Sequence, residues 1–208
     1  MKFPNCGTTP LGIYPIVERT DKLEPLYKCG ITTSQLRVKN LEGEELEREI
    51  VEAIKISKKY NARLFINDFW ELAIKHKAYG IHLGQEDLVD ADLNAIHNAA
   101  IRLGVSTHTT KEIELALHIK PSYLAIGPIF ETTSKVVNYN VVGVEELGNW
   151  SKNVHYPIVA IGGINLSNIE AIINLHSVDG VAMISELLEG EEISTEKTKL
   201  LLKLFSKK

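Results

Sequence analysis

The stretch RLFINDFWELAIKHKAYGIHLGQEDL, residues 63–88, decides the fold. It opens with an apolar run that ends in polar residues, RLFIND (63–68), and it closes with a second such run, GIHLG (80–84). Between them, the segment from Leu72 to His76 has the spacing of a short helix. Two β-rich runs joined by a helical segment are typical of a strand–helix–strand unit with parallel strands.

The same alternation continues toward both ends of the chain. The predicted strands are 12–18, 33–39, 63–68, 80–84, 102–108, 123–130, 158–164 and 180–185. The predicted helices are 22–28, 44–60, 72–76, 93–100, 113–119, 144–150, 169–175 and 195–205. Strict alternation implies a parallel sheet, and eight units imply that the sheet closes. The sequence therefore predicts an α/β fold, a (β/α)₈ TIM barrel that occupies residues 1–208 as a single domain.

Composition restricts the class of partner. The 208 residues are 44% hydrophobic and 24% charged, with a formal net charge of −4. A chain of this charge has no general attraction for nucleic acid or an anionic membrane, so we expect small-molecule partners. Residues 1–10 contain no apolar run, and Cys6 and Cys29 form no CxxC motif. We expect a soluble cytoplasmic protein with free thiols. The oligomeric state stays open, a homo-oligomer included.

Polar residues gather where the predicted strands end. Active sites of such barrels lie at the C-terminal ends of the strands, so these residues are the candidates for chemistry. They are Gln35, Arg37, Lys39, Asn67, Asp68, Gln85, Glu86, Asp87, Ser106, His108, Thr132, Thr133, Ser134, Lys135 and Ser185. A rim that combines cations, carboxylates and hydroxyls predicts a site for anionic ligands.

Two cations lie at the end of the second predicted strand. Gln35, Arg37 and Lys39 alternate along the chain and are therefore expected to point to the same side. Cations on a buried barrel strand are costly without anionic partners, which favours a phosphate-binding role. Solvated charges at a strand end are the alternative.

Two carboxylates end neighbouring strands. Asp68 and Asp87 each stand near a predicted helix start, where an aspartate often caps the helix. Taken together, they face one cavity and predict a Mg²⁺ site completed by water and substrate phosphate. No Cys or His cluster accompanies them, so zinc is not expected.

Gly162–Gly163 and Ile184–Ser185 end the last two strands. Loops at these positions of a barrel often bind phosphate through backbone N–H groups, and glycine permits the close approach. Tight turns also need glycine. Combined with the cations at the end of the second strand, the pattern predicts a barrel of the phosphate-binding type that takes two anionic substrates or one long one.

Three further features concern the rim. His82 is expected to be a hydrogen-bonded interior histidine, whereas His108 ends a strand at the rim and its role stays open. The irregular stretch from Glu131 to Val142 is expected to serve as a lid or binding loop. A disordered surface excursion is the alternative for that stretch.

Five runs carry a resemblance to a known family. They are QLRVK (35–39), the run 63–88, LGVSTH (103–108), AIGGI (160–164) and GVAMIS (180–185). Their order along nearly the whole chain resembles bacterial thiamine phosphate synthase. The run 63–88 is highly specific, whereas AIGGI is shared by many phosphate-binding barrels.

The resemblance implies a role for each matching residue. The substrates would be a phosphorylated pyrimidine and a phosphorylated thiazole, and the cofactor Mg²⁺. Asp68 and Asp87 would hold the metal, and Lys135, Arg37 and Lys39 would act in catalysis. Residues that would contact the pyrimidine diphosphate are Gln35, Leu36, Arg37, Val38, Lys39, Asn67, Ser106 and Lys135. Residues that would contact the thiazole phosphate are Thr132, Thr133, Ser134, Gly163, Ile184 and Ser185.

The chain departs from the family pattern in one loop. The family usually has proline where this chain has Glu131 and threonine where it has Ser134, and it has prolines within 136–143. We expect these changes to affect loop closure and KM more than the reaction. Three rivals remain: a thiazole tautomerase that uses His108, a non-catalytic sensor of thiamine intermediates, and an unrelated phosphate-binding isomerase.

Overall fold

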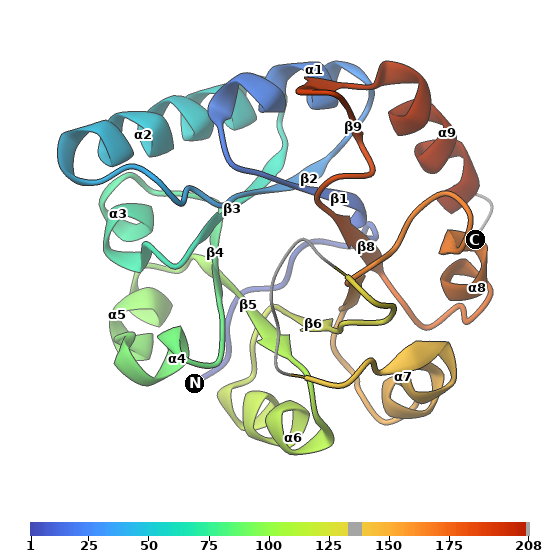
Figure 1. The fold of residues 1–208 in the computed structure, drawn as a ribbon. Helices are drawn as coiled ribbons and strands as arrows, with labels where there is room; N and C mark the ends of the chain where they lie inside the picture. The colour runs from blue at the N-terminus through green and yellow to red at the C-terminus, as the bar shows by residue number, and fades with distance from the viewer. Residues whose placement is uncertain (133–138, 207–208) are drawn as a thin grey trace.

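The computed structural model describes residues 1–132 and 139–206. Eight parallel strands close into a barrel in chain order, with β1 paired to β8, and helices surround them (Figure 1). The barrel strands are β1 (Gly12–Val17), β2 (Thr33–Leu36), β3 (Arg63–Asn67), β4 (Gly80–Leu83), β5 (Arg102–Thr107), β6 (Tyr123–Ile126), β7 (Ile158–Ile161) and β8 (Gly180–Met183). The predicted fold class is confirmed.

The helices form the outer layer. They are α1 (Leu23–Lys28), α2 (Gly43–Lys59), α3 (Trp70–Lys75), α4 (Asp87–Asp90), α5 (Leu93–Asn98), α6 (Thr110–Ile119), α7 (Gly143–Ser151), α8 (Ile169–Ile173) and α9 (Thr195–Phe205). A 3₁₀ turn, η1 (Thr20–Lys22), precedes α1, and β9 (Leu188–Glu189) pairs with β10 (Glu192–Ile193) outside the barrel. No helix within the described ranges is both long and apolar enough to cross a membrane.

The longest helix, α2, shows why the outer layer forms. Its apolar residues Leu46, Ile50, Ala53 and Ile54 are all buried, because they recur at the spacing of one helical face. Acidic residues occupy its first turn and lysines its last turn, as the helix dipole favours. The sequence pattern therefore fixes both the length of the helix and the face that packs on the barrel.

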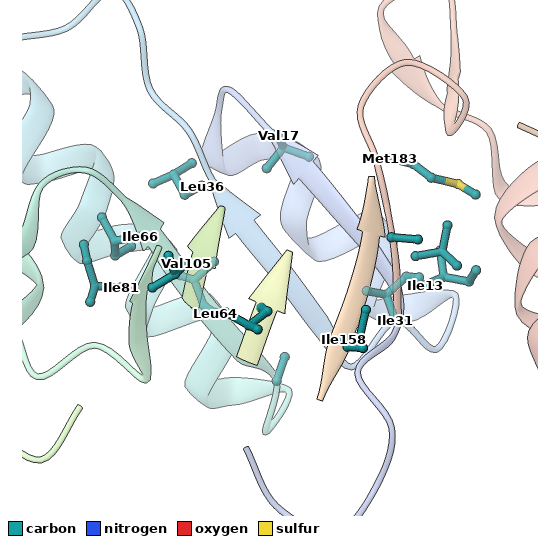
Figure 2. Close-up of a cluster of buried hydrophobic side chains, with 14 of the residues drawn as sticks. Ile13, Val17, Ile31, Leu36, Leu64, Ile66, Ile81, Val105, Ile158 and Met183 are labelled. Carbon is teal, nitrogen blue, oxygen red and sulfur yellow. The ribbon is translucent and has the colours of Figure 1, made fainter. Parts of the chain in front are cut away.

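Side chains alternate between two hydrophobic cores. Figure 2 shows outward-facing strand residues such as Val17, Leu64 and Ile81, which belong to the core between barrel and helices. The intervening residues point inward and form a separate core inside the barrel, which includes Tyr14 and Tyr123. A strand places successive side chains on opposite faces, so both cores follow from one pattern.

Glycines make room for the aromatic rings inside the barrel. A Cβ atom on Gly104 would lie 2.2 Å from the ring of Tyr123, and one on Gly80 would lie 2.5 Å from the ring of Phe65. Such distances are far below van der Waals contact, so only glycine fits beside these rings. The two glycines of β4 and β5 thereby allow large side chains to fill the barrel interior.

All eight strands end earlier than the sequence pattern indicated, and four of them end two or more residues earlier. The strands predicted over 33–39, 123–130, 158–164 and 180–185 end at residues 36, 126, 161 and 183. After β6, Pro128 has no N–H to donate to a ladder. After β7, Gly162 and Gly163 have φ values of +100° and +65°, which a strand does not contain. The apolar residues that follow the observed strand ends lie in loops instead.

Candidate active site

The strand pleat brings polar side chains together at the C-terminal end of the barrel. Inward-facing Gln35, Asn67, His82 and Ser106 come from β2, β3, β4 and β5, and they line one cavity of about 140 Å³. Ile16, Arg37, Asp68, Gly84, Asp87, His108, Gly127, Pro128, Thr132, Ile161 and Ile184 complete its lining. The structure therefore brings together most of the residues that the sequence placed at the rim.

The two carboxylates at this cavity are positioned by different parts of the fold. Asp68 follows β3 with a φ of +63°, in the left-handed region that aspartate tolerates better than most residues. Asp87 is the first residue of α4, and its Oδ2 accepts the N–H of Gly84 at 3.2 Å. Asn67 donates its side-chain amide to Asp68. Both carboxylates are thus held at the cavity wall by local backbone geometry and short contacts.

Neither aspartate occupies the N-cap position of its helix. The N-cap of α3 is Phe69, and the N-cap of α4 is Glu86, neither with a side-chain capping bond. Within residues 1–132 and 139–206, three or more His, Cys, Asp or Glu side chains nowhere form a cluster able to hold a metal. Mg²⁺ is commonly held by one or two carboxylates, and water and phosphate fill its other coordination positions. The two aspartates fit this arrangement.

The residues at the end of β2 and after it divide into two sets. Arg37 lines the cavity, whereas Leu36 and Val38 point into the outer hydrophobic core. Contact of Leu36 or Val38 with a ligand in the cavity is therefore limited to their backbone atoms. Lys39 lies further out, where it pairs with Glu18 beyond β1. Since its side chain is 42% exposed, Lys39 in this structure matches the alternative of a solvated strand-end charge.

A second cavity of about 220 Å³ adjoins the first. Its lining includes Gly163, Ile184 and Ser185, which the sequence predicted to bind phosphate. Thr132, Ile161 and Ile184 line both cavities and so form the wall between them. The other lining residues are Glu131, Gly162, Ile164, Asn165, Ala182, Met183 and Glu186. Glu131 and Glu186 are the charged members of this described set, so an anion here would depend on backbone N–H groups.

The paired glycines after β7 have a packing role of their own. A Cβ atom on Gly163 would lie 2.3 Å from the carbonyl oxygen of Glu131, and one on Gly162 would lie 2.6 Å from Pro128. The N–H groups of Ile129 and Phe130 donate to the carbonyls of Ile161 and Gly162. These glycines therefore let the segment after β6 lie directly on the end of β7, which sets the wall between the cavities.

His108 is fixed on two sides at the rim of the first cavity. Its Nδ1 lies 3.0 Å from the carboxylate of Glu112, which also accepts the His108 backbone N–H at 2.6 Å. Its ring lies against that of Tyr139, with ring centroids 4.0 Å apart. Partial burial and the nearby carboxylates of Glu112 and Glu86 raise the pKa of Tyr139. Glu112 stands three residues after the Thr109 cap of α6, so a local capping pattern accounts for its position.

His82 is an interior histidine, as predicted. It is 6% exposed, and its ring nitrogens lie 2.7 Å from Tyr123 Oη and 2.8 Å from Ser106 Oγ. Sequence reasoning missed Tyr14 and Tyr123, which extend this hydrogen-bonded chain, because both stand in runs that are typical of buried strands. The predicted site residues Thr133, Ser134 and Lys135 lie outside the described residues.

Comparison with known proteins identifies the family. The family model described as thiamine monophosphate synthase matches residues 13–187. Thiamine-phosphate synthase of Photorhabdus laumondii is 46% identical over 195 residues, which cover 91% of this chain and 90% of that protein. The corresponding protein of Proteus mirabilis is 45% identical over 192 residues, which cover 92% of this chain and 89% of that protein.

A solved structure agrees with these relatives. Thiamine phosphate pyrophosphorylase from Pyrococcus furiosus superposes with a TM-score of 0.83 at 27% identity, covering 95% of this chain and 96% of that one. Phosphoribosylanthranilate isomerase from the same organism, at 12% identity and a TM-score of 0.67, shares the fold alone. Because the family model matches residues 13–187 and these relatives match nearly the whole chain, the chain belongs to the thiamine monophosphate synthase family.

Proposed function

We propose that the chain joins 4-amino-2-methyl-5-(diphosphooxymethyl)pyrimidine to 4-methyl-5-(2-phosphooxyethyl)thiazole, or to its carboxylated form. The products are thiamine phosphate and pyrophosphate, as the names of the relatives indicate for those proteins. One observation about the site carries the proposal. Two cavities with different linings share the wall of Thr132, Ile161 and Ile184, so two phosphorylated substrates can bind side by side.

The first cavity suits the diphosphate. Arg37, Asn67 and Ser106 line it, which gives a guanidinium, an amide and a hydroxyl to phosphate oxygens. Gln35 lies deeper, 3% exposed, where its amide can orient the ring that carries the diphosphate. The family resemblance assigns Lys39 and Lys135 to the same diphosphate.

The second cavity suits the phosphate of the thiazole. Within the described ranges, the N–H groups of Gly163 and Ser185 donate to no protein acceptor. Gly163 has a φ of +65°, a conformation that glycine adopts without strain. Backbone N–H groups of residues that line one cavity are the kind of anion site that barrels build after their last strands.

The residues that are present fit a magnesium ion. Asp68 and Asp87 would hold it, because both carboxylates line the first cavity and Asp68 adopts a left-handed backbone conformation there. When bound, the metal would neutralise charge that develops on the departing pyrophosphate. Arg37 adds to that neutralisation from the same cavity.

The bond changes need no strong base. The lone pair of the thiazole nitrogen forms the new C–N bond at the pyrimidine methylene, and the C–O bond to the diphosphate breaks. The electron pair of that bond leaves with the pyrophosphate, which the cations and hydrogen-bond donors of the first cavity stabilise. Catalysis then consists of positioning two substrates across the shared wall and stabilising the leaving group.

The experiment is a rate measurement with both substrates. Pyrophosphate release is followed with and without Mg²⁺, and thiamine phosphate is sought by mass spectrometry. Reactions that lack either substrate serve as controls. We expect both products only when the two substrates and Mg²⁺ are all present. Saturable binding of both substrates without product would contradict the proposal and favour a sensor.

A second function has one observation in its favour. His108 pairs with the carboxylate of Glu112 at the rim of the first cavity, and an imidazole–carboxylate pair suits proton transfer in an isomerase. A thiazole tautomerase would isomerise its substrate without Mg²⁺ and without releasing pyrophosphate. Incubation of the thiazole tautomer alone, followed by ultraviolet absorption, separates this reaction from the condensation.

We also propose that the protein works in the cytoplasm as a thiol-containing enzyme. Cys6 and Cys29 are both free. Free cysteines without any disulfide are the usual state of proteins in a reducing compartment.

A further inference from the structure

Two consecutive peptide groups after β7 have their carbonyls held by residues outside the second cavity. The Gly162 carbonyl accepts the backbone N–H of Phe130 at 3.0 Å. The Gly163 carbonyl accepts the side-chain amide of Asn168 at 3.0 Å. Gly162 and Gly163 line the second cavity, whereas Phe130 and Asn168 are not part of its lining. Both carbonyl oxygens are therefore turned toward neighbours that do not line the cavity.

The side-chain amide of Asn168 has a single orientation in this arrangement. Its Oδ1 accepts the backbone N–H of Asn165 at 2.8 Å, and its Nδ2 donates to the Gly163 carbonyl. A backbone N–H can only donate and a backbone carbonyl can only accept, so the two ends of the amide cannot exchange roles. The side chain of Asn165 adds a longer bond to the same carbonyl, at 3.4 Å. Two side-chain amides thus hold the Gly163 carbonyl.

Asn168 does not use its side chain to cap the helix that follows it. It is the N-cap residue of α8, yet its side chain makes no capping bond there. Asparagine is common at N-caps because its oxygen usually accepts an N–H of the first helical turn. Here both polar atoms of the side chain bond back along the chain, to Asn165 and Gly163. The side chain therefore acts on the loop after β7 rather than on the helix.

A held carbonyl also fixes the N–H group of the same peptide. The peptide bonds that follow Gly162 and Gly163 are trans, and in a trans peptide the C=O and N–H point in opposite directions. The N–H groups of Gly163 and Ile164 therefore point away from Phe130 and Asn168. Within the described ranges, neither group donates to a protein acceptor. Since Ile164 is only 6% exposed and lines the second cavity, its N–H needs an acceptor there.

We propose that Asn168 is a positioning residue, which holds the Gly163 carbonyl away from the second cavity and so turns the Ile164 N–H toward the phosphate of the thiazole. The proposal rests on the proposed function for the identity of that phosphate. Successive N–H groups form a concave anion site. Glycine lacks a Cβ atom and permits the reversed peptide as well, in which the carbonyl oxygen would face the phosphate and repel it. Asn168 selects the orientation that attracts the anion.

The charges around the cavity make this orientation important. Glu131 and Glu186 are the charged residues of its described lining, and both are acidic. Glu186 also occupies the N–H of Leu166, at 3.2 Å. Among the described lining residues, no lysine or arginine can offset the loss of a backbone donor. An anion in this cavity should therefore depend strongly on how the peptide after Gly163 is turned.

The first test reads the two N–H groups directly. ¹H–¹⁵N NMR spectra of the wild-type protein are recorded during titration with inorganic phosphate. We expect the amide protons of Gly163 and Ile164 to shift downfield as they donate to the anion. Phosphate binding without a shift at Ile164, or no phosphate binding, would overturn the proposal. This measurement needs no turnover, so its result is independent of the proposed reaction.

The second test removes the bonds of Asn168. Asn168→Ala adds no charge, whereas Asn168→Asp keeps the acceptor for Asn165 but sets a carboxylate oxygen against the Gly163 carbonyl. We expect each variant to raise the KM of the thiazole phosphate about tenfold or more. We expect kcat at saturating substrate to stay within about twofold of wild type, because the lost interaction is made equally in the ground state and the transition state. The downfield shift of Ile164 should also disappear.

The controls separate this role from support of the fold. Ser167→Ala is the matched variant, because Ser167 bonds Asn165 Oδ1 at 2.6 Å in the same turn but lies outside the cavity lining. We expect it to behave as wild type, and we expect every variant to keep the wild-type KM for the pyrimidine diphosphate. Equal rises in both KM values, or an unchanged Ile164 shift in Asn168→Ala, would contradict the assignment of Asn168.

Failure of the proposed function would look different. In that case, the wild type would bind phosphate with the shift at Ile164, and Asn168→Ala would lose it, but no pyrophosphate would be released from the two substrates. The role of Asn168 in anion binding would then stand, and the condensation would not.

Discussion

The imidazole of His108 lies flat on the phenol ring of Tyr139, with ring centroids 4.0 Å apart and ring planes 4° from parallel. His108 follows β5 and lines the first cavity, whereas Tyr139 comes between β6 and α7. The contact therefore joins the cavity rim to a segment more than thirty residues away in the chain. Such stacking contributes about 0.5–1.5 kcal/mol beyond the area it buries.

Loss of this stacked pair should weaken substrate binding. We expect Tyr139→Ala to raise the KM of at least one substrate severalfold, because His108 then loses the ring that covers one of its faces. Tyr139→Phe keeps the ring and is the matched control, with KM values close to wild type. Initial rates over both substrate concentrations measure the effect. Equal KM values for the alanine and phenylalanine variants would show that the contact has no part in binding.

The carboxylate of Asp68 should be needed for turnover rather than for folding. Asn tolerates the left-handed φ of +63° at this position, so Asp68→Asn should fold normally. We expect kcat to fall on the order of a hundredfold or more, because the metal loses a charged ligand. Asp90→Asn, on the exposed surface of α4, is the control. Wild-type turnover by Asp68→Asn would remove Asp68 from the magnesium site.

Release of Lys39 from its ion pair should favour the pyrimidine diphosphate. Lys39 pairs with Glu18, and both side chains are more than a third exposed, so the pair itself stabilises the fold by about 1 kcal/mol or less. We expect Glu18→Gln to lower the KM of the diphosphate, because the ammonium no longer has a competing carboxylate. Lys39→Met should raise that KM. If Glu18→Gln left the KM unchanged, Lys39 would have no contact with the substrate.

The carboxylates beside the second cavity should oppose the thiazole phosphate. Glu131 and Glu186 line this cavity, and Glu186 also accepts the N–H of Leu166 at 3.2 Å. We expect Glu131→Gln and Glu186→Gln each to lower the KM of the thiazole phosphate by about fivefold or less, since partly solvated like charges repel weakly. The KM of the pyrimidine diphosphate serves as the internal control and should not change. A rise in the thiazole phosphate KM would mean that these carboxylates assist binding.

One surface ion pair should give the fold a defined response to acid. Hydrogen bonds from Lys59 and then Tyr60 lower the pKa of Glu24 to about 2, from an ordinary value of 4.5. Because the folded-state pKa is the lower one, the stabilisation is complete above the unfolded pKa and is lost as pH falls from 4.5 toward 2. Glu24→Gln should make the free energy of unfolding depend less on pH in this window. Identical pH profiles for both proteins would rule out this role.

The alternation of strand and helix patterns predicted the fold, and the polar residues at the predicted strand ends predicted the site. Inward-facing Gln35 and Ser106 were found because the period of two along a strand survives in any sheet. Strand ends were predicted less well, since Ile129 and Phe130 are as β-rich as the residues of β6 but follow Gly127 and Pro128. The helix α4, with four residues, is too short to show a helical period.

The buried hydrogen bonds that join Tyr14, Tyr123 and His82 could not be predicted for a different reason. Tyr14 and Tyr123 are 109 residues apart, and nothing in either run indicates that their hydroxyls meet. The barrel closure that brings β1 and β6 to face each other is a global property of the fold. Gly104 was the one local signal, because a glycine inside a strand often marks close approach of a large neighbour.

The most direct test of the two-cavity account is a crystal structure with Mg²⁺, pyrophosphate and the thiazole phosphate bound together. We expect pyrophosphate and the metal beside Asp68, Asp87 and Ser106, and the thiazole phosphate group at the N–H groups of Gly163 and Ser185. The thiazole nitrogen should then face the first cavity across the wall of Thr132, Ile161 and Ile184. Both anions in one cavity, or a metal away from Asp68 and Asp87, would contradict the account.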